Sequence, residues 1–403
     1  MATPEPAPLP PLQPLAYHQD VVCYLREHEP EVWRWAQSAQ AQREHADAVR
    51  GELLKHTYRL DAAAHPELHH AARTAAGRLH LDVPLTLYQA TDGPMNAALF
   101  FVPGEAHVVF SGPLLERLQG AELEAVLGHE LSHYLLWTEE DGAYHAADRV
   151  LVATAEDPRA NAAHLQTARL YRLFTEAYAD RGSVVACAAL EPAVTALVKT
   201  QTGLPKVSAA SYLQQADEIV SRPGWSTEAS SHPEVFVRAR ALRLWSQEDA
   251  QAEEWLASAL RGALTLDAAD LLGQQELVRL TRRVLQQVLR PAWMRTEATL
   301  AHARRFFPDF AASEAPDDTL GAQIAAADGC HEYVAALLLD LATADLDMDE
   351  VPLAAALELA KAWGVAATLA ARVQRDLKMP KRQFNKLKQE AAALVQRTAA
   401  KHV

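Results

Sequence analysis

The chain has 403 residues and a formal net charge of −14, because 52 acidic side chains outnumber 38 lysines and arginines. This balance argues against nucleic-acid binding, which requires a basic face. The three scattered cysteines offer neither a disulfide framework nor a C-x-x-C metal pair. Since the sequence shows neither a secretory leader nor an apolar run of about 18 residues, we expect a cytoplasmic protein without a membrane span.

The length predicts two or three folded units, and the composition divides the chain into five segments. A Pro-rich flexible tail covers residues 1–15, and an N-terminal helical segment follows over 16–60. Residues 61–245 contain most of the motifs described below. A helical connector covers 246–312, and a C-terminal helical domain covers 313–403. Leucine and valine recur three and four residues apart in much of the chain, which predicts a predominantly α-helical protein of the α+β class.

Three short β-type runs precede the central helix, at residues 85–90, 96–102 and 107–110. The last two are separated by Pro-Gly-Glu-Ala at 103–106, which predicts a hairpin loop. Together the runs predict a small antiparallel sheet. An edge strand of such a sheet can bind an extended peptide through backbone hydrogen bonds, and this role is compatible with an ordinary structural one.

Residues 128–134 read Gly-His-Glu-Leu-Ser-His-Tyr, inside a stretch whose apolar residues recur at helical spacing. His129 and His133 are four residues apart and share a helix face, with Cβ atoms about 5–6 Å apart. Both imidazoles can therefore reach one zinc ion at roughly 2.0–2.1 Å. Glu130 is placed to take the proton of a metal-activated water, whose pKa falls to about 7. The pattern predicts metal-assisted hydrolysis; the alternative is two surface histidines on an ordinary helix.

Gly128 occupies the middle of this predicted helix, where glycine costs about 0.8–1 kcal/mol relative to alanine. A residue that weakens the helix beside a candidate site indicates that another part of the chain packs closely there. We therefore expect a tight contact at Gly128.

A zinc hydrolase needs a third protein ligand, and two glutamates are candidates. Glu139 lies six residues after His133, where metzincins place their third histidine, but Leu136 occupies the position at which those enzymes need a turn-forming glycine. Glu176 lies on a later predicted helix together with Asp180, four residues on. One carboxylate of this pair can bind the metal while the other holds a ligating imidazole from outside the coordination sphere. We predict Glu176 as the ligand and Asp180 as its supporting residue.

The C-terminal helical domain ends in a basic stretch at residues 378–388. Such a stretch is typical of a solvated helix face. A docking surface for an acidic protein partner is the alternative.

With these motifs the chain resembles metallopeptidase family 48, which belongs to the gluzincin clan and includes HtpX and the CAAX prenyl proteases. The likeness spans about residues 65–245. It is carried by an Asn-Ala strand, a following strand and turn, the two helices described above, and a late His-Pro motif with an arginine six residues after the histidine. These segments are 95–99, 107–115, 128–133, 176–181 and 231–233 with Arg238.

The resemblance implies one zinc ion per chain, bound by His129, His133 and Glu176, with Glu130 as general base and a peptide or protein as substrate. It also implies that Asn96 and Ala97 bind substrate. His232 and Arg238 are expected to have catalytic or substrate-contacting roles. The alternative for that last segment is a helix start, with Ser231 as the cap and Pro233 in the first turn.

The chain departs from the family pattern near the predicted ligands. The family usually has glycine where Ser132 stands, alanine where Gly128 stands, and glycine two residues after the Asp-Arg pair, whereas Gly182 follows that pair immediately. His232 is followed by Pro-Glu-Val instead of the usual Pro-Pro-Thr. None of these departures replaces a predicted ligand.

The sequence as a whole predicts a zinc-dependent metalloendopeptidase that hydrolyses peptide bonds, with its metallopeptidase domain at residues 61–245. One alternative is a catalytically silent interaction protein that keeps the fold and binds a protein partner through its C-terminal helical domain. A second is a zinc hydrolase that acts on a non-peptide bond.

Overall fold

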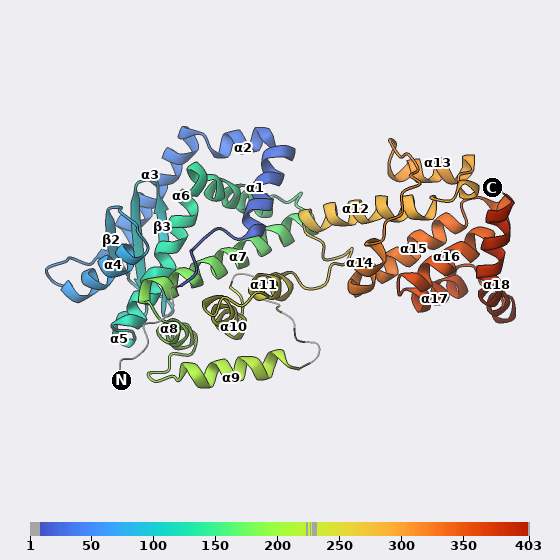
Figure 1. Cartoon of the computed structure of the whole chain (residues 1–403). Helices are drawn as coiled ribbons and strands as arrows, with labels where there is room; N and C mark the ends of the chain where they lie inside the picture. Colours follow the sequence, from blue (N-terminus) through green and yellow to red (C-terminus); the bar gives the residue numbers. More distant parts are fainter. Residues whose placement is uncertain (1–8, 223–224, 226, 228–231, 402–403) are drawn as a thin grey trace. The chain divides into compact units, whose positions relative to one another are not determined.

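The computed structural model describes residues 9–222, 225, 227 and 232–401. The chain forms two compact units, residues 1–262 and 263–403, which are described separately (Figure 1). The predicted segments 16–60 and 61–245 both lie in the first unit. The five-segment division remains a prediction, because the two compact units are coarser than it. Residues 1–8 of the predicted flexible tail lie outside the described part of the chain.

The first unit is mainly helical and contains one small sheet, so the predicted α+β class is confirmed. Its elements are α1 Ala16–His28, α2 Pro30–Ala36, α3 Ala39–His56, β1 Thr57–Arg59, α4 Pro66–Arg78, β2 Leu85–Ala90, β3 Asn96–Val102, β4 Glu105–Ser111, α5 Leu114–Arg117, α6 Ala121–Glu156, α7 Ala162–Cys187, α8 Leu190–Thr202, α9 Ala209–Val220, α10 Val235–Ser246 and α11 Ala252–Arg261.

The sheet has the strand order β1-β2-β4-β3 and is mixed, which corrects the expectation of purely antiparallel pairing. Strands β3 and β4 form the predicted hairpin, but its loop is shorter: Val102 pairs with Glu105, so only Pro103 and Gly104 form the turn. Gly104 has φ +82°, a conformation that favours glycine. Strand β4 turns back to lie between β3 and β2, and it therefore runs parallel to β2. The sequence alone does not specify this insertion. The spacing of apolar residues along a strand is the same whichever strand lies beside it.

Alternate residues of the sheet bury against helices on its two faces. Leu87 and Val108 share a core with Leu127 of α6 and with alanines of α4. Tyr88 and Val109, their neighbours in sequence, pack instead with Leu53 of α3. Strand β3 pairs only with β4 among the described strands, so it forms an edge of the sheet beside α6.

Helix α1 belongs to the core of the first unit. Tyr17 stacks on Phe174 of α7, with ring centroids 4.5 Å apart. His18 is fully buried, and its Nε2 lies 3.1 Å from Oγ1 of Thr175. Burial, followed by the charge of Arg181, lowers the pKa of His18 to about 3, so this imidazole is neutral in the folded protein. The contacts show that α1 supports α7 directly before Glu176.

Helices α6 and α7 make a close contact at small residues, as expected from Gly128. A Cβ atom at Gly128 would lie 2.1 Å from the Cβ of Ala186, and one at Gly182 would lie 1.7 Å from Oγ of Ser132. Each helix therefore has a glycine where the other brings a side chain. Two of the departures from the family pattern, Ser132 and Gly182, are partners in one contact.

This pairing predicts a compensated double substitution. Gly182→Ala is expected to lower the free energy of unfolding by about 1–2 kcal/mol, since overpacking exceeds the gain in helix propensity. Ser132→Gly with Gly182→Ala removes the clashing hydroxymethyl group and is expected to recover most of that loss. Denaturant unfolding of both single variants and the double variant checks this coupling. Additive effects of the two substitutions would contradict the contact.

The second unit consists of helices around a hydrophobic core of its own, with α15 in contact with α12, α16 and α17. Its elements are α12 Leu271–Val288, η1 Ala292–Met294, α13 Glu297–Phe306, α14 Leu320–Ala326, η2 Asp328–Cys330, α15 His331–Ala342, η3 Leu346–Met348, α16 Val351–Ala362, α17 Ala366–Asp376 and α18 Lys381–Ala400.

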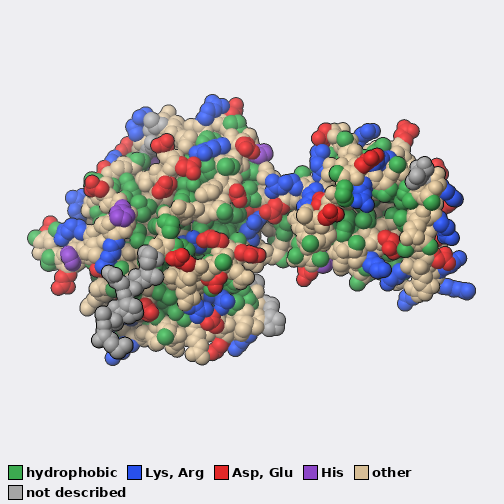
Figure 2. Space-filling model, in the orientation of Figure 1, with side chains coloured by type: hydrophobic (Ala, Val, Ile, Leu, Met, Phe, Trp, Pro, Cys, Tyr) green, Lys and Arg blue, Asp and Glu red, His purple; other side chains and the backbone are tan. Residues whose placement is uncertain are grey.

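The basic stretch at 378–388 leads into α18 and covers its first half. Phe384 and Leu387 bury into the core, whereas the lysines and arginine of the stretch are exposed. Basic side chains are visible along α18 in Figure 2. An amphipathic helix of this kind fits a solvated face, and its use as a docking surface remains a prediction.

Candidate metal centre

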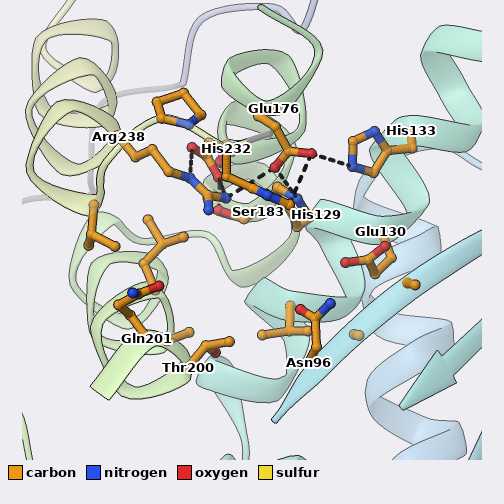
Figure 3. Close-up of a pocket in the computed structure, with 18 of the residues that line it drawn as sticks. Asn96, His129, Glu130, His133, Glu176, Ser183, Thr200, Gln201, His232 and Arg238 are labelled. Atoms are coloured by element: carbon orange, nitrogen blue, oxygen red, sulfur yellow. Dashed lines mark hydrogen bonds and ion pairs between the residues drawn. The ribbon is translucent and has the colours of Figure 1, made fainter. Parts of the chain in front are cut away.

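Helices α6 and α7 bring the three predicted ligands together. His129 and His133 lie on one face of α6, and Glu176 approaches from α7 (Figure 3). His129 Nε2 is 3.3 Å from Glu176 Oε2, and His133 Nε2 is 3.7 Å from Glu176 Oε1. One ligand atom from each residue lies within 4.8 Å of the other two. Among the described residues, this is the cluster of histidine, cysteine and acidic side chains with the geometry to hold a metal ion.

The chemistry of these donors fits zinc. Two imidazoles and one carboxylate are a ligand set found in catalytic zinc sites, which keep a further position open. Glu176 is buried, and its Oε2 lies 3.3 Å from His129 Nε2 but has no hydrogen-bond partner. A buried carboxylate oxygen normally has a partner, and a divalent cation between the three side chains would supply one.

The electrostatics of the cluster are dominated by the carboxylates of α7. Burial opposes a charge on His129, but its close contacts with the carboxylates of Asp180 and Glu176 raise its pKa to about 10. His133 behaves oppositely, because burial lowers its pKa to about 4 even though Glu176 attracts the proton. The pKa of Glu176 lies well below its usual value despite burial, since His129 stabilises the carboxylate. Metal binding at this centre must therefore displace a proton from His129.

Asp180 lies behind the cluster and orients His129. Its Oδ1 is 3.1 Å from His129 Nδ1, so the Nε2 atom of the same ring is the one that faces Glu176. Arg238 of α10 donates two hydrogen bonds to Asp180, at 2.7 Å from Nε and 2.6 Å from Nη2. The Nη2 atom also lies 3.6 Å from Glu176. The structure thus places Arg238 on a carboxylate that contacts the predicted ligand His129, a connection absent from the sequence pattern.

Glu130 lies beside the cluster on the same helix and lines the cavity in front of it. Its side chain is buried. Burial raises the pKa of Glu130 to about 7, while the charge of His129 and a hydrogen bond with the backbone of Leu99 oppose the shift. The carboxylate therefore lies between the metal-ligand cluster and edge strand β3.

The other predicted site residues occupy different parts of the cavity wall. The side chain of His232 is 54% exposed, with Nε2 3.5 Å from Glu176 Oε1. Asn96 and Ala97 line the cavity at the start of β3. Helix α10 begins at Val235, with Glu234 as its N-cap, so Pro233 precedes the helix. Ser231, the remaining residue of the late motif, lies outside the described residues.

Glu139, the alternative third ligand, is exposed and lies at a kink in α6. Helical geometry ends there, and Glu140, Asp141 and Gly142 all have positive φ. Glu140 accepts a hydrogen bond from the hydroxyl of Tyr144 at 2.8 Å, which holds the kinked segment. Because the helix continues through Leu136 without an earlier turn, Glu139 is not part of the cluster with His129 and His133.

The cavity has a volume of about 1030 Å³ and is lined by β3, α6, α7, α8 and α10. The contribution of α8 was not predicted from the sequence. Its cavity-facing residues recur at helical spacing, but that spacing alone does not indicate which neighbour the helix faces. They are Ala193, Ala196, Leu197, Thr200 and Gln201. An ion pair between Lys199 and Glu122 of α6, at 2.7 Å, helps to fix α8 beside the active helix.

Comparison with known proteins finds related peptidases. Residues 62–246 match the model of peptidase family M48, which confirms the likeness predicted over about 65–245. The plastoglobule-localized metallopeptidase 48 of Arabidopsis thaliana, a chloroplastic protein, is 29% identical over 206 residues, which are 45% of this chain and 57% of the relative. A protease HtpX homolog of Pediococcus pentosaceus is 36% identical over 81 residues, 20% of this chain and 27% of the relative.

The matches therefore span less than two thirds of the length of either curated relative. Within the described part of the chain, the helices are all too short or too polar to cross a membrane.

Proposed function

We propose that this chain, whose residues 62–246 belong to peptidase family M48, is a zinc-dependent endopeptidase that acts in the cytoplasm. The observation that carries the proposal is the convergence of His129, His133 and Glu176 around one point, with Glu130 beside them. Zinc, when bound by these three residues, supplies Lewis acidity and lowers the pKa of a bound water to about 7. The remaining roles belong to the side chains and backbone of the protein.

Glu130 is the proposed proton carrier of the reaction. Its carboxylate faces the cavity between the ligand cluster and β3, so it can accept a proton from the attacking water and return it to the leaving amine nitrogen. The free edge of β3 at Asn96 and Ala97 is the proposed binding site for an extended peptide backbone. An endopeptidase needs such backbone binding, because side chains vary along a protein substrate.

Arg238 and Asp180 are proposed to position His129. The two hydrogen bonds from Arg238 fix the carboxylate of Asp180, which in turn fixes the imidazole ring. This arrangement supports a positioning role for Arg238 instead of the catalytic role expected from the resemblance. His232 approaches Glu176 from the exposed side of the cavity, and a substrate-contacting role for it remains a proposal.

Asp180→Asn tests this positioning. The substitution preserves size but removes the charge, and we expect zinc affinity or turnover to fall by roughly 10- to 100-fold while the protein stays folded. Competition with a chromophoric chelator measures the affinity. Asp217→Asn is the control, because Asp217 is likewise paired with arginine side chains, those of Arg240 and Arg243, but does not line the cavity. Equal losses in both variants would contradict a specific role for Asp180.

The function itself is tested by metal analysis of the purified protein and digestion of a broad peptide library. We expect one zinc ion per chain and internal cleavage that stops on chelation. Stoichiometric zinc without cleavage of any peptide would favour the silent interaction protein. All three proposed ligands and Glu130 are present, which favours an active peptidase over the silent interaction protein.

A further inference from the structure

We propose that Asp148 forms a side-chain subsite in the cavity that selects a substrate with a lysine or arginine near the bond that is cut. This inference rests on the proposed peptidase function and adds the class of substrate. The subsite lies at the end of the cavity formed by the second half of α6 and the middle of α7, and we call this end the acidic arm.

Helices α6 and α7 lie antiparallel across the site. His129 of α6 contacts Asp180 of α7 at 3.1 Å. Farther along α6, the carbonyl of Tyr144 accepts a hydrogen bond at 2.8 Å from the hydroxyl of Tyr171 on α7. Later residues of α6 therefore face earlier residues of α7. A cavity that follows both helices past the ligand cluster leads toward Asp148.

The cavity extends in this direction, because its lining includes Asp148 and Val152 of α6 and Arg172 and Thr175 of α7. Arg172 lies four residues before the proposed ligand Glu176, which corresponds to about 6 Å along the helix axis. An extended peptide advances by about 3.3 Å per residue. A substrate side chain in the acidic arm therefore belongs to a residue about two positions from the bond that is cut.

Asp148 is a half-buried carboxylate without a partner. Among the described residues, no group forms a hydrogen bond or an ion pair with it. Burial raises the pKa of Asp148 to about 6, and the charge of Arg172 opposes this shift. The group is therefore mostly ionised at neutral pH, although a charge removed from water is normally paired. A cation carried by the substrate would supply the missing partner.

The surroundings of Asp148 suit a long basic side chain. The ring of Trp137 lies 5.6 Å from the rings of both His133 and His145, so it connects the ligand cluster to the second half of α6. Trp137 lines the cavity, and so does Val152, one turn after Asp148. The methylene groups of lysine or arginine can pack on such apolar surface while the charged end reaches a carboxylate.

Arg172 does not give the acidic arm the opposite preference. Its side chain is exposed, whereas Asp148 is half-buried. Salt and water screen an exposed charge more strongly than a partly buried one. An acidic substrate side chain therefore gains less from Arg172 than a basic side chain gains from Asp148, and the acidic arm favours the basic one.

Digestion of a library of amino-terminally acetylated peptides by the zinc-loaded full chain tests the proposal. Mass spectrometry of the products is expected to show lysine and arginine enriched at one position, about two residues from the cut bond. Two peptides that differ only there, with lysine in one and norleucine in the other, share the methylene stem and differ in the charge. We expect their kcat/KM values to differ by about 10- to 100-fold.

Asp148→Asn identifies the group that causes the preference. This variant is expected to reduce the lysine-to-norleucine ratio to about threefold or less, while zinc content stays unchanged and the norleucine peptide is still cut. Asp148→Glu keeps the charge and is expected to retain most of the ratio. Asp20→Asn makes the same substitution at an exposed position of α1 outside the cavity lining and is expected to behave as wild type.

The outcomes separate this inference from the proposed function. If zinc-loaded wild type cleaves no peptide, the peptidase function fails, and the subsite fails with it. Cleavage without enrichment of basic residues near the cut bond would overturn the subsite and leave the peptidase standing. A lysine preference that survives in Asp148→Asn would overturn the assignment to Asp148. Cleavage that requires a free amino terminus would show that Asp148 binds the α-ammonium group and would overturn the selection of a basic side chain.

Discussion

Glu130→Gln is expected to leave the protein folded and zinc-bound but to reduce peptide hydrolysis by about 10⁴-fold or more. General-base assistance typically contributes about 10²–10⁴-fold, and here one carboxylate takes the proton from water and also delivers it to the leaving amine. Glutamine keeps the size and helix preference of the side chain, and Glu130 is not among the three ligand residues. The loss should therefore appear in turnover alone.

Paired measurement of zinc stoichiometry and turnover checks this expectation. The control is Glu116→Gln, which makes the same replacement on α5 at a position outside the cavity lining. It should retain both zinc and activity. Turnover near the wild-type level in Glu130→Gln would show that another group carries the proton, even if the metal site is correct.

Glu176→Ala should lose most of the bound zinc, whereas Glu139→Ala should keep it. Removal of one of three protein ligands leaves two imidazoles, which are too few donors for a stable catalytic site. Glu139 is exposed at the kink of α6 and does not belong to the ligand cluster. Metal analysis after dialysis against a weak chelator measures the difference directly.

A second measurement distinguishes loss of a ligand from misfolding as the cause of metal loss. Glu176 is buried beside His129 and Arg238, so Glu176→Gln, which preserves its volume, should accompany the alanine variant. Both variants should show wild-type circular dichroism and reduced zinc content. Zinc bound equally by wild type and Glu176→Ala would exclude Glu176 as the third ligand.

The sequence by itself determined the features that depend on local spacing. The four-residue separation of His129 and His133 places them on one helix face wherever that helix lies. The same rule links Glu176 and Asp180 on a second helix. Gly128 indicated a close contact because glycine in a helix has a cost that only packing explains. These local rules sufficed for the helical α+β class and for the likeness to a peptidase family.

Tertiary structure decided everything that required two distant segments to meet. The meeting of Glu176 with the two histidines depends on how α7 packs against α6, at Gly182 and Ser132, and the kink that follows Thr138 keeps Glu139 out of that cluster. The attachment of Arg238 to Asp180 joins residues 58 positions apart. No helical or strand period extends over such a distance, so local pattern carries no information about it.

The sheet and the cavity show the same limit. The insertion of β4 between β2 and β3 made the sheet mixed, and the β-type runs of the sequence do not show which strands pair or in which direction. The sequence of α8 is that of an ordinary amphipathic helix. Leu197 faces the cavity because α8 packs beside α6, where the ion pair between Lys199 and Glu122 helps to hold it. A sequence period specifies which face of an element is apolar. Which neighbour covers that face is set by the packing of the whole chain.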